Sequence, residues 1–432
     1  MKSFLKKCIP EFVFSFYYFL WAYIGTLVYR FPSKEMIIIG ITGTKGKTST
    51  SNLIWSVLQH SGIKTGMIST ANIRIGDEEI PNTFHMSMPG RFFIQKTLRQ
   101  MVKRGCKVAI VETTSQGIMQ FRHIGIAYDV AIFTNLSPEH IEAHGGYENY
   151  KKAKGKLFEV LSKSKTKFFN QKEFSKTILA NVDSKDAEYF LEFPATKKQT
   201  FSLSAPSDFR ATHIQLSDTG STFEVQNHTF ALDLPGNFNI YNAIPAIVVG
   251  EMFDLSLDII STNLQKLHSI PGRMEEIKNE KGFRVFVDYA HEPAGLQAVI
   301  ETANQMKSGE GRSLVLLGCA GGGRDKDRRG IMGSTAGRYA DIVVVSDDEP
   351  YEEDPQDILN AIKKGAEESG KKEHENLFVI GDRREGIKKM LSLAKAGDIL
   401  VFTGMGHQIV RVVGKETIPW VEKEIIQEEL GR

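Results

Sequence analysis

The sequence predicts an α/β protein in which two domains each contain a doubly wound parallel sheet. Three observations support this prediction. A glycine-rich turn separates an apolar run from a helical pattern near residue 40, short apolar runs alternate with helical spacing up to about residue 268, and a second alternation of this kind follows. Short apolar runs bounded by turns are typical of parallel strands buried on both faces, with helices covering the two sides of the sheet.

The overall composition is that of a globular protein of several domains. The chain has 432 residues, of which 41% are hydrophobic and 25% are charged, and this length allows two or three independent cores. A net charge of +2 indicates no basic surface for nucleic acid, so we expect no such partner. The three cysteines, Cys8, Cys106 and Cys319, lack C-x-x-C spacing, which excludes a disulfide framework and fits a reducing, cytoplasmic environment.

The N-terminal segment, residues 1–33, is mostly apolar. Residues 12–29 carry no charge and lie between several lysines and Arg30, a length just sufficient to cross a bilayer. Their many Phe, Tyr and Trp side chains suit a membrane interface and a protein core alike. We expect either an interfacial anchor over residues 9–31, which would hold the protein at the inner face of the membrane, or a helix packed on the protein itself; a membrane span ranks third.

The glycine-rich turn, GITGTKGKTSTSNL at 40–53, matches the pattern G-x-x-x-x-G-K-[ST]. Backbone N–H groups of such a loop and of the following helix point at one spot that suits a polyphosphate, with Lys47 on its outer oxygens and the Thr48 hydroxyl on Mg²⁺. An ordinary Gly/Thr-rich connection is the weaker alternative, because strand, loop and helix fall in the required order. The residues expected to bind a nucleoside triphosphate are Gly43, Thr44, Lys45, Gly46, Lys47, Thr48 and Ser49.

The rest of the first domain continues the alternation of strands and helices. Apolar runs at 107–115 and 128–137 end in polar residues, and helical spacing occurs, for example, at 92–103. In open α/β sheets, ligands bind beyond the carboxyl ends of such strands. From about 200 to 234 the pattern changes to alternation with turn signals, which predicts a small antiparallel β flap, and helical spacing resumes over 234–252.

A second α/β series follows a boundary near residues 268–277. Five apolar runs predict an open parallel, Rossmann-like sheet, at residues 283–290, 313–322, 341–350, 376–382 and 398–406. The glycine cluster within this series carries too much charge for a dinucleotide fingerprint. The predicted domains are therefore a central nucleotide-binding domain at 34–268 and a C-terminal domain at 269–432.

Three polar residues could join the phosphate loop in binding metal. Glu112 ends a predicted strand, His140 follows the next one, and Lys154 lies in a Lys-rich helical segment. Each alone has an ordinary explanation, respectively a strand-end carboxylate, a capping histidine and a solvated lysine face. Grouped around a phosphate loop, they can position hard cations that bridge phosphate oxygens.

Several ordered motifs resemble those of the Mur ligases, the ATP-dependent amide-forming enzymes of peptidoglycan assembly. Between residues 39 and 408 they read TGTKGKTS, ETTSQGIMQFR, FTNLSPEHIEAHGGYENYKKAK, PGNFNIYNA, PGRME, VDYAHEP, GCAGGGRDKDRRGIMG and TGMGHQ. The chain most resembles the branch that adds the third peptide residue, the UDP-N-acetylmuramoyl-tripeptide synthetases. The resemblance implies a ligase of cell wall biogenesis, with a role in cell shape and cell division, that joins an amino acid to a muramyl peptide through an acyl phosphate.

The resemblance also implies roles for particular residues. Thr48 and Glu112 would hold one Mg²⁺ against the ATP phosphates, and His140 with a carbamylated Lys154 would hold a second. Lys47, Lys154 and His140 would be catalytic, with Lys47 acting on the γ-phosphate. Further ATP contacts would be Asn239, Asn242, Arg273 and Asp288. The acceptor and amino-acid contacts would be Ser115, Gln120, Arg122, Arg324, Asp348, Glu349, Tyr351, Gly404, His407 and Gln408.

Some positions depart from the family pattern. Fewer than 40 residues precede the phosphate loop, where the tripeptide synthetases carry a domain that grips the uridine nucleotide, so a UDP-linked and a lipid-linked acceptor both stay open. Asp348-Glu349-Pro350-Tyr351 stands where diaminopimelate enzymes have Asp-Asn-Pro-Arg, and Tyr cannot replace the bidentate Arg clamp on a carboxylate. Gln408 replaces a Glu that would pair with a side-chain amine. Neither diaminopimelate nor lysine is supported as the added amino acid.

Two alternatives to a muramyl ligase stay open. One is another ligase of the superfamily, a folylpolyglutamate synthetase or a poly-amino-acid synthetase, although the Gln120-x-Arg122 pair and VDYAHEP favour the muramyl branch. The other is a non-enzymatic nucleotide-binding scaffold, which would not need both metal sites. For the favoured function we expect a monomer whose ligands are ATP, Mg²⁺, a muramyl-peptide acceptor and an amino acid.

Overall fold

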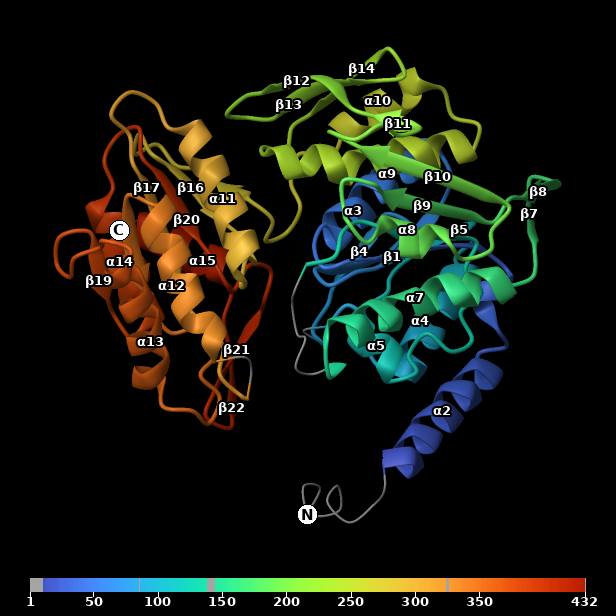
Figure 1. Cartoon of the computed structure of the whole chain (residues 1–432), viewed down its shortest axis with the longest axis horizontal. Coiled ribbons are helices and arrows are strands. Elements are labelled where there is room, and N and C mark those ends of the chain that lie inside the picture. Colours follow the sequence, from blue (N-terminus) through green and yellow to red (C-terminus); the bar gives the residue numbers. More distant parts are fainter. Residues whose placement is uncertain (1–10, 85, 138–143, 324–325, 432) are drawn as a thin grey trace. The chain divides into compact units, whose positions relative to one another are not determined.

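The computed structural model describes residues 11–84, 86–137, 144–323 and 326–431. The chain divides into two compact units, both of which are α/β structures, so the predicted fold class is confirmed (Figure 1). Residues up to 214, with 223–231 and 239–267, form the first unit. Residues from 268 onward form the second, together with the short segments 215–222 and 232–238, which the sequence had grouped with the central domain.

The first unit is built on a nine-stranded sheet of order β11-β10-β9-β6-β1-β5-β2-β3-β4. Neighbouring strands from β11 to β2 are parallel, and β3 and β4 add an antiparallel edge. The strands are β1 (Ile37–Thr42), β2 (Thr65–Ile68), β3 (Asn72–Ile75), β4 (Glu78–Pro81), β5 (Val108–Glu112), β6 (Val130–Phe133), β9 (Thr177–Asn181), β10 (Lys197–Ser202) and β11 (Phe209–Arg210). Every residue of β1 and β5 is buried, as expected of central strands covered on both faces.

Helices cover both faces of this sheet (Figure 1). One face carries α3 (Lys47–His60), α9 (Asn237–Met252) and α10 (Leu257–Gln265), and the other carries α4 (Arg91–Lys103), α5 (Ser115–Met119), α7 (Tyr147–Lys163) and α8 (Ala187–Leu191). These helices cover the sheet because each has an apolar side. In α4, for example, Ile94, Leu98 and Met101 recur at helical spacing and are buried against the sheet. Helix α4 begins one residue earlier than the helical spacing at 92–103 predicted.

The small flap is present, but it begins later than the sequence predicted. The strands β12 (Thr212–Leu216), β13 (Ser221–Val225) and β14 (His228–Leu232) form a separate three-stranded sheet. Residues near 200, which the sequence placed in the flap, instead form β10 and pair in parallel with β9. A strand near a sheet edge is only partly buried, so its sequence pattern resembles that of a strand in a small exposed sheet. A short hairpin that was not predicted joins β7 (Lys167–Phe169) to β8 (Lys172–Phe174).

The second unit contains a six-stranded sheet of order β15-β16-β20-β17-β18-β19. The five strands predicted from the sequence are present and mutually parallel, and β15 pairs antiparallel with β16. The strands are β15 (Glu275–Ile277), β16 (Arg284–Val287), β17 (Ser313–Leu317), β18 (Ile342–Val345), β19 (Leu377–Val379) and β20 (Ile399–Phe402), and a hairpin follows with β21 (Val410–Val413) and β22 (Glu416–Pro419).

This second sheet is also doubly wound. In β17, Val315 and Leu317 point to a core shared with α11 (Pro293–Met306), α12 (Asp327–Tyr339) and α13 (Pro355–Glu368). The alternate residues Leu314 and Leu316 point to the core shared with α14 (Arg383–Leu393) and α15 (Glu422–Leu430). Since successive side chains of a strand face opposite sides, a continuous apolar run is what two covered faces require.

The N-terminal helix α2 (Glu11–Val28) precedes a short 3-10 turn, η1 (Pro32–Lys34). One side of α2 packs on α4, and Trp21 and Phe92 lie with ring centres 5.6 Å apart. In the part of the chain that the structure describes, no helix is long and apolar enough to cross a membrane. The third-ranked prediction, a membrane span, therefore receives no support; residues 9 and 10 of the predicted anchor lie outside the described residues.

Candidate active site

The glycine-rich loop connects β1 to α3, and two of its glycines adopt backbone conformations that other residues rarely adopt. Gly43 has a φ of 151° and Gly46 a φ of 81°. A methyl group at Gly43 would overlap the Thr134 hydroxyl, and one at Gly46 would overlap the side-chain oxygen of Asn242. The first N–H groups of α3 have no acceptor within the helix, so this end of the helix favours an anion.

The loop is braced by the two residues that follow β6. The backbone N–H of Thr44 donates to the carbonyl oxygen of Asn135 at 2.9 Å, and that of Lys45 donates to the Asn135 side-chain oxygen at 2.9 Å. The Thr134 hydroxyl donates to the Lys45 carbonyl at 2.6 Å. Because β6 is the parallel neighbour of β1, its carboxyl end reaches the loop, as the sequence led us to expect.

Two lysines from different helices converge on the carbonyl oxygen of Gly43. Lys47 Nζ donates to it at 2.9 Å and to the Thr44 carbonyl at 2.8 Å. Lys154 Nζ, which comes from α7, donates to the same Gly43 oxygen at 2.8 Å. Only 2% of Lys154 is exposed, so the alternative of a solvated lysine face is wrong for this residue. Two cationic groups beside a phosphate-type loop, of which Lys154 is buried and Lys47 partly exposed, create a strong local attraction for a polyanion.

A buried histidine that the sequence did not single out, His144, lies at the same corner. The Tyr150 ring lies 5.1 Å from the His144 ring and 4.4 Å from Lys154 Nζ. Burial, and next the charge of Lys154, lower the pKa of His144, which makes it a neutral imidazole. Among the described residues, neither ring nitrogen of His144 has a hydrogen-bond partner. The signal was the second histidine of EHIEAHGG; the first one, His140, lies outside the described residues.

Glu112 and Thr48 supply hard oxygen donors next to the loop. Glu112 ends β5, is fully buried and is in register with Ile41 of β1. Its carboxylate accepts hydrogen bonds from the Thr70 hydroxyl at 2.7 Å and the Thr70 N–H at 3.2 Å. Carboxylate and hydroxyl oxygens are ligands that Mg²⁺ prefers, so the donor chemistry of these residues fits the expected ion.

No described residues form a group of three or more His, Cys, Asp and Glu side chains suited to a metal. A metal bound by this part of the chain would therefore take other donors as well, such as the Thr48 hydroxyl, a carbamylated Lys154 or the oxygens of a phosphate. Those are the donors that the sequence predicted together with Glu112 and His140.

The residues expected to hold an acceptor gather near α5. Ser115 is the first residue of α5 and is buried. The Arg122 guanidinium donates to the side-chain oxygen of Gln120 and to the carbonyl of Met88. The neighbouring Ser87 hydrogen-bonds to Thr70, and Thr70 in turn contacts Glu112. The candidate acceptor residues are thus connected to the candidate metal ligand by a short polar network.

Asn239 and Asn242 project from the first turns of α9 toward α3. Both are buried, and the Asn242 amide donates to the Asn239 side-chain oxygen at 3.2 Å. The hydroxyl of Thr50, in α3, donates to the Asn242 side-chain oxygen at 3.4 Å. The first unit therefore brings these two asparagines beside the phosphate loop, which is far from them in sequence.

Arg273 and Asp288 belong to the second unit. Asp288 is buried and accepts hydrogen bonds from the N–H groups of Met274 and Ala290, each at 2.7 Å. Burial raises the pKa of Asp288, while the charge of Arg273 opposes that effect. The Arg273 guanidinium lies 4.9 Å from the centre of the Tyr289 ring. Asp288 therefore links the segment just before β15 to the turn that follows β16.

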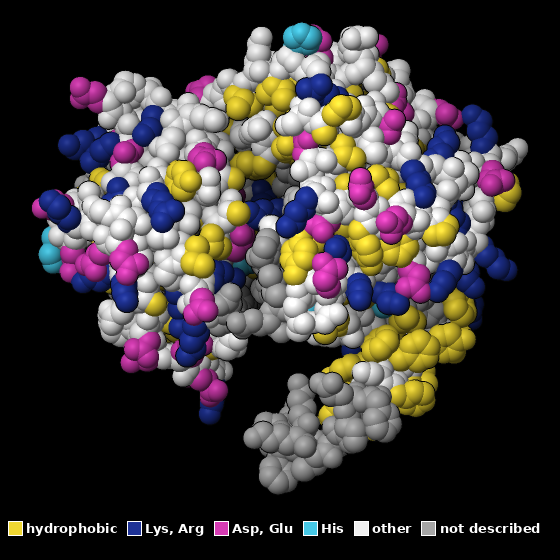
Figure 2. Space-filling view, viewed as in Figure 1, with side chains coloured by type: hydrophobic (Ala, Val, Ile, Leu, Met, Phe, Trp, Pro, Cys, Tyr) yellow, Lys and Arg dark blue, Asp and Glu magenta, His cyan; other side chains and the backbone are white. Residues whose placement is uncertain are grey.

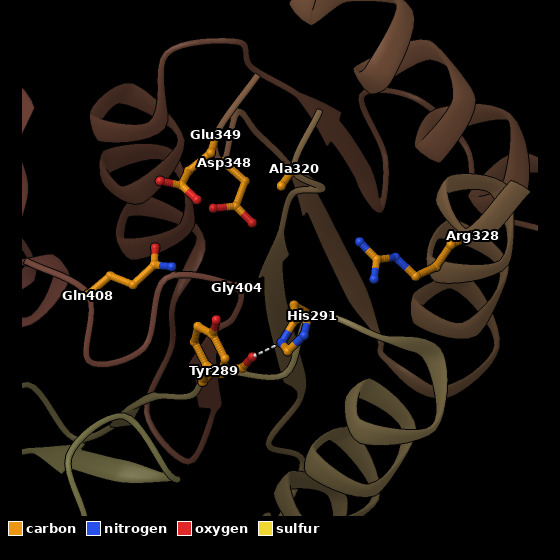
Figure 3. A pocket seen from close by; sticks show the side chains of 8 residues that line it. All are labelled: Tyr289, His291, Ala320, Arg328, Asp348, Glu349, Gly404 and Gln408. Atoms are coloured by element: carbon orange, nitrogen blue, oxygen red, sulfur yellow. Dashed lines mark hydrogen bonds between the residues drawn. The ribbon is translucent and has the colours of Figure 1, made fainter. Parts of the chain in front are cut away.

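The second unit also contains a polar pocket (Figure 3). It is lined by Tyr289, His291, Ala320, Arg328, Asp348, Glu349, Gly404 and Gln408. Figure 3 shows the two carboxylates entering from the loop after β18, with Gln408 and the guanidinium of Arg328 on opposite sides. Buried Gln408 Oε1 and Arg328 Nε have no hydrogen-bond partner within the part of the chain that the structure describes, so a ligand could satisfy both of them.

Half of the lining was predicted, namely Asp348, Glu349, Gly404 and Gln408. The motifs VDYAHEP and GCAGGGRDKDRRG contain the other four, which the sequence reasoning did not assign to the pocket. Two predicted residues lie beside the lining: Tyr351 next to Gly322, and His407 with its ring 4.8 Å from that of Tyr289. Arg324 lies outside the described residues.

The pocket loops are held by buried charged groups. Arg411 Nε donates to the Asp348 carbonyl at 2.8 Å. Arg383 forms an ion pair with Glu422 at 2.6 Å, both side chains being fully buried, and donates to the carbonyl of Thr403 at 2.6 Å. These contacts tie the loops after β18 and β20 to α14 and α15, which keeps the lining residues in place.

The fold and these residues define a phosphate-loop nucleotide-binding protein with a second α/β unit that carries a polar pocket. Comparison with protein families refines this class. Residues 41–250 match the Mur ligase middle domain, and residues 272–406 match the Mur ligase, glutamate ligase domain. The chain belongs to the Mur ligase family, as the sequence predicted.

Individual relatives agree with this assignment. The chain is 35% identical over 415 residues to UDP-N-acetylmuramoyl-L-alanyl-D-glutamate--2,6-diaminopimelate ligase of Bacillus cereus, covering 95% of this chain and 81% of the relative. It is 33% identical over 402 residues to UDP-N-acetylmuramyl-tripeptide synthetase of Roseiflexus sp., covering 91% and 78%. The structure of Mycobacterium tuberculosis folylpolyglutamate synthase complexed with ADP and AMPPCP shares the fold, with a TM-score of 0.69 at 18% identity over 89% of this chain and 91% of that chain.

Proposed function

We propose that this Mur ligase is an ATP-dependent acid–amino acid ligase that adds an amino acid to a muramyl-peptide precursor of peptidoglycan, acting as a monomer in the cytoplasm. The observation that carries the proposal is the convergence of Lys47 and Lys154 on the Gly43 carbonyl, at a loop whose N–H groups suit a polyphosphate. The Bacillus cereus and Roseiflexus relatives, which are named for muramyl substrates, support the acceptor.

The reaction has two steps. An acceptor carboxylate oxygen forms a bond to the γ-phosphorus of ATP, and the bond from that phosphorus to the β,γ-bridging oxygen breaks, which releases ADP and leaves an acyl phosphate. The amine of the amino acid then bonds to the acyl carbon, phosphate leaves with the electron pair, and the nitrogen loses a proton. Lys47 reduces the negative charge that builds on the γ-phosphoryl oxygens in the first step.

Two Mg²⁺ ions belong to the proposal. Thr48 and Glu112 would hold one; His140 and Lys154 would hold the other, with Lys154 as its carbamate. A lysine amine in its uncharged form can add CO₂ to become an oxygen ligand. When bound, the ions would neutralise charge on the ATP phosphates. Gly43, Thr44, Lys45, Gly46, Ser49, Asn239, Asn242, Arg273 and Asp288 complete the proposed ATP contacts.

The two substrates would bind at different parts of the chain. Ser115, Gln120 and Arg122 would hold the acceptor in the central domain, residues 34–268. In the C-terminal domain, residues 269–432, the amino acid would contact residues of the polar pocket or its border: Arg324, Asp348, Glu349, Tyr351, Gly404, His407 and Gln408. The pocket carboxylates are suited to an amine and the Arg328 guanidinium to a carboxylate, which are the two groups common to every amino acid.

A coupled ADP-release screen tests the proposal. Individual amino acids are offered with UDP-muramyl-dipeptide, with its lipid-linked form or with a folate, and Lys47→Ala provides the background. We expect ADP release that needs both a muramyl acceptor and one amino acid. Release with the folate alone would favour the folylpolyglutamate alternative. If no pair of acceptor and amino acid gives more ADP than the Lys47→Ala variant does, the proposed ligase activity is contradicted.

A further inference from the structure

Helix α2 is apolar on both of its sides, but only one side is covered. On the covered side, Ala22 is 2% exposed, and the Thr26 hydroxyl is fully buried at 3.5 Å from the carbonyl of Ile124. A methyl group at Gly25 would lie only 3.5 Å from the Phe92 ring. This side rests firmly on α4 and on the loop that follows α5.

The other side of α2 is an uncovered apolar face. Phe16, Leu20, Tyr23 and Leu27 follow one another at spacings of four, three and four residues, which places them on one side of the helix. They are 65%, 42%, 45% and 47% exposed. Figure 2 shows the hydrophobic side chains gathered on this helix, where it extends from the first unit. A helix that is apolar all round is ordinarily buried, so a partner for this face is expected.

The surroundings of this apolar face are basic. Glu11 is the one charged residue within α2, and the flanking residues Arg30 and Lys34 are exposed cations. The helix beside it, α4, carries Arg91, Lys96, Arg99 and Lys103 and no acidic residue, and Arg99 forms an ion pair with the exposed Glu35. Lys2, Lys6 and Lys7 precede α2 in the sequence. An apolar face bordered by lysines and arginines complements an anionic lipid surface, in which acyl chains lie beneath negative headgroups.

We propose that α2 lies flat in the surface of an anionic bilayer. The apolar face would enter the acyl region, and Arg30, Lys34 and Lys96 would meet the headgroups. Tyr17, Trp21 and Tyr23, which are 52%, 41% and 45% exposed, suit the water–lipid boundary because their rings are apolar and their edges polar.

This position would bring the candidate acceptor site to the membrane. The rings of Phe19, in α2, and Phe121 meet edge to face at 6.1 Å. Phe121 stands between Gln120 and Arg122, and Arg91 lies 4.2 Å from the Tyr18 ring. A bound α2 therefore holds the candidate acceptor residues near the headgroups, where a lipid-linked muramyl peptide would be found. This consequence rests on the proposed function, whereas the binding of α2 to lipid does not.

Vesicle sedimentation of the full chain tests the proposal. The protein should pellet with vesicles that contain phosphatidylglycerol, less at high salt, and poorly with phosphatidylcholine alone. The triple variant Phe16→Ser/Leu20→Ser/Leu27→Ser should lower the partition coefficient at least about tenfold, because it removes three apolar side chains from the contact. Phe168→Ser is the matched control, since Phe168 is 69% exposed but lies on β7; it should pellet as the unchanged protein does.

A second measurement does not depend on how the triple variant folds. Brominated lipids should quench part of the tryptophan fluorescence of the unchanged protein. Trp21→Phe should abolish that part, because Trp55 is buried and the partly buried Trp420 belongs to the second unit, not to the unit that carries α2. Absence of pelleting, or equal pelleting of the triple variant, would overturn the proposal. So would a dimer in vesicle-free solution that the triple variant converts to monomer, since the apolar face would then join two copies. If the protein proved to have no ligase activity, the expected pelleting and quenching by vesicles would still be the same.

Discussion

The phosphate-loop region of the first unit presents two neighbouring lysines, whereas the pocket of the second unit presents two neighbouring carboxylates, on sheets of the same class. In the first, Lys47 and Lys154 direct two cationic groups to one carbonyl oxygen. In the second, Asp348 and Glu349 bring two carboxylates to the pocket. Both groups of residues follow the carboxyl ends of parallel strands. The fold thus determines where a site forms, and the side chains determine which ligand it accepts.

The two regions also differ in how their polar groups are satisfied. The phosphate loop is closed by hydrogen bonds to Thr134 and Asn135, and its lysines donate to backbone oxygens. Within the described residues, the pocket retains buried polar atoms on Arg328 and Gln408 without a partner. The phosphate loop itself is therefore organised before a ligand arrives, although His144 beside it also keeps unpartnered ring nitrogens among these residues, whereas a ligand would complete the pocket. The following predictions test this contrast.

The largest effect is expected from Lys47→Ala. It removes the cation proposed to act on the γ-phosphoryl group, and the rate of ADP release should fall about 10³-fold. The thermal unfolding midpoint should change little, because Lys47 contacts backbone oxygens and packs no core. Lys198→Ala, at an exposed position in β10, is the control. An active Lys47→Ala enzyme would mean that the γ-phosphate lies elsewhere.

Lys154→Ala should lower activity about 10²- to 10³-fold if the residue acts as a carbamate that binds metal. Bicarbonate or a short-chain carboxylate should restore part of the rate, since either can supply the missing oxygen ligand. Lys156→Ala is the matched control, because Lys156 lies in the same helix, is exposed and pairs with Glu159. Full activity of Lys154→Ala would leave Lys154 with only a structural role.

Acid should destabilise the first unit through His123. Burial, and next the charge of Lys156, lower the pKa of His123 from 6.5 to about 4. The folded state therefore binds this proton less readily than the unfolded state. The stabilisation is complete above pH 6.5 and is lost as the pH falls toward 4, by up to about 3 kcal/mol.

Unfolding of the full chain, followed by urea titration between pH 7 and pH 4, measures this loss. His123→Gln should flatten the pH dependence over that interval, because glutamine does not titrate. If the free energy of unfolding of His123→Gln falls with pH as steeply as that of the unchanged protein, other groups cause the acid sensitivity.

The smallest effect is expected from Gln408→Glu in the pocket. The new carboxylate would join Asp348 and Glu349 and could pair with a positively charged amine. The rate of ADP release should therefore shift several-fold in favour of amino acids with a side-chain amine. Gln356→Glu, which adds the same charge at an exposed position of α13, is the control. An identical preference in the two variants would show that Gln408 does not contact the amino acid.

The sequence alone determined the elements whose signals are local. The loop glycines, Lys47 and the apolar runs of β5 and β6 were all located from pattern, because the phosphate-binding motif is contiguous and a buried strand shows as an apolar run. The boundary of the flap was misplaced. The pairing of β10 with β9 joins separate stretches of the chain, and the local pattern of β10 does not reveal it.

Tertiary structure decided which of several similar residues matter. The helix α7 contains Lys151, Lys152, Lys154 and Lys156, and only Lys154 is buried, because it shares the inward side with Tyr150 and Leu157. His144 and Arg328 joined the candidate sites for the same reason, through packing between distant segments.

The N-terminal helix shows the same limit of sequence. Its composition fitted an interface and a core equally, and the structure shows one side packed on α4 and the other uncovered. An amino-acid pattern records that a side chain avoids water, but the identity of whatever covers it depends on the surfaces that meet when the chain has folded.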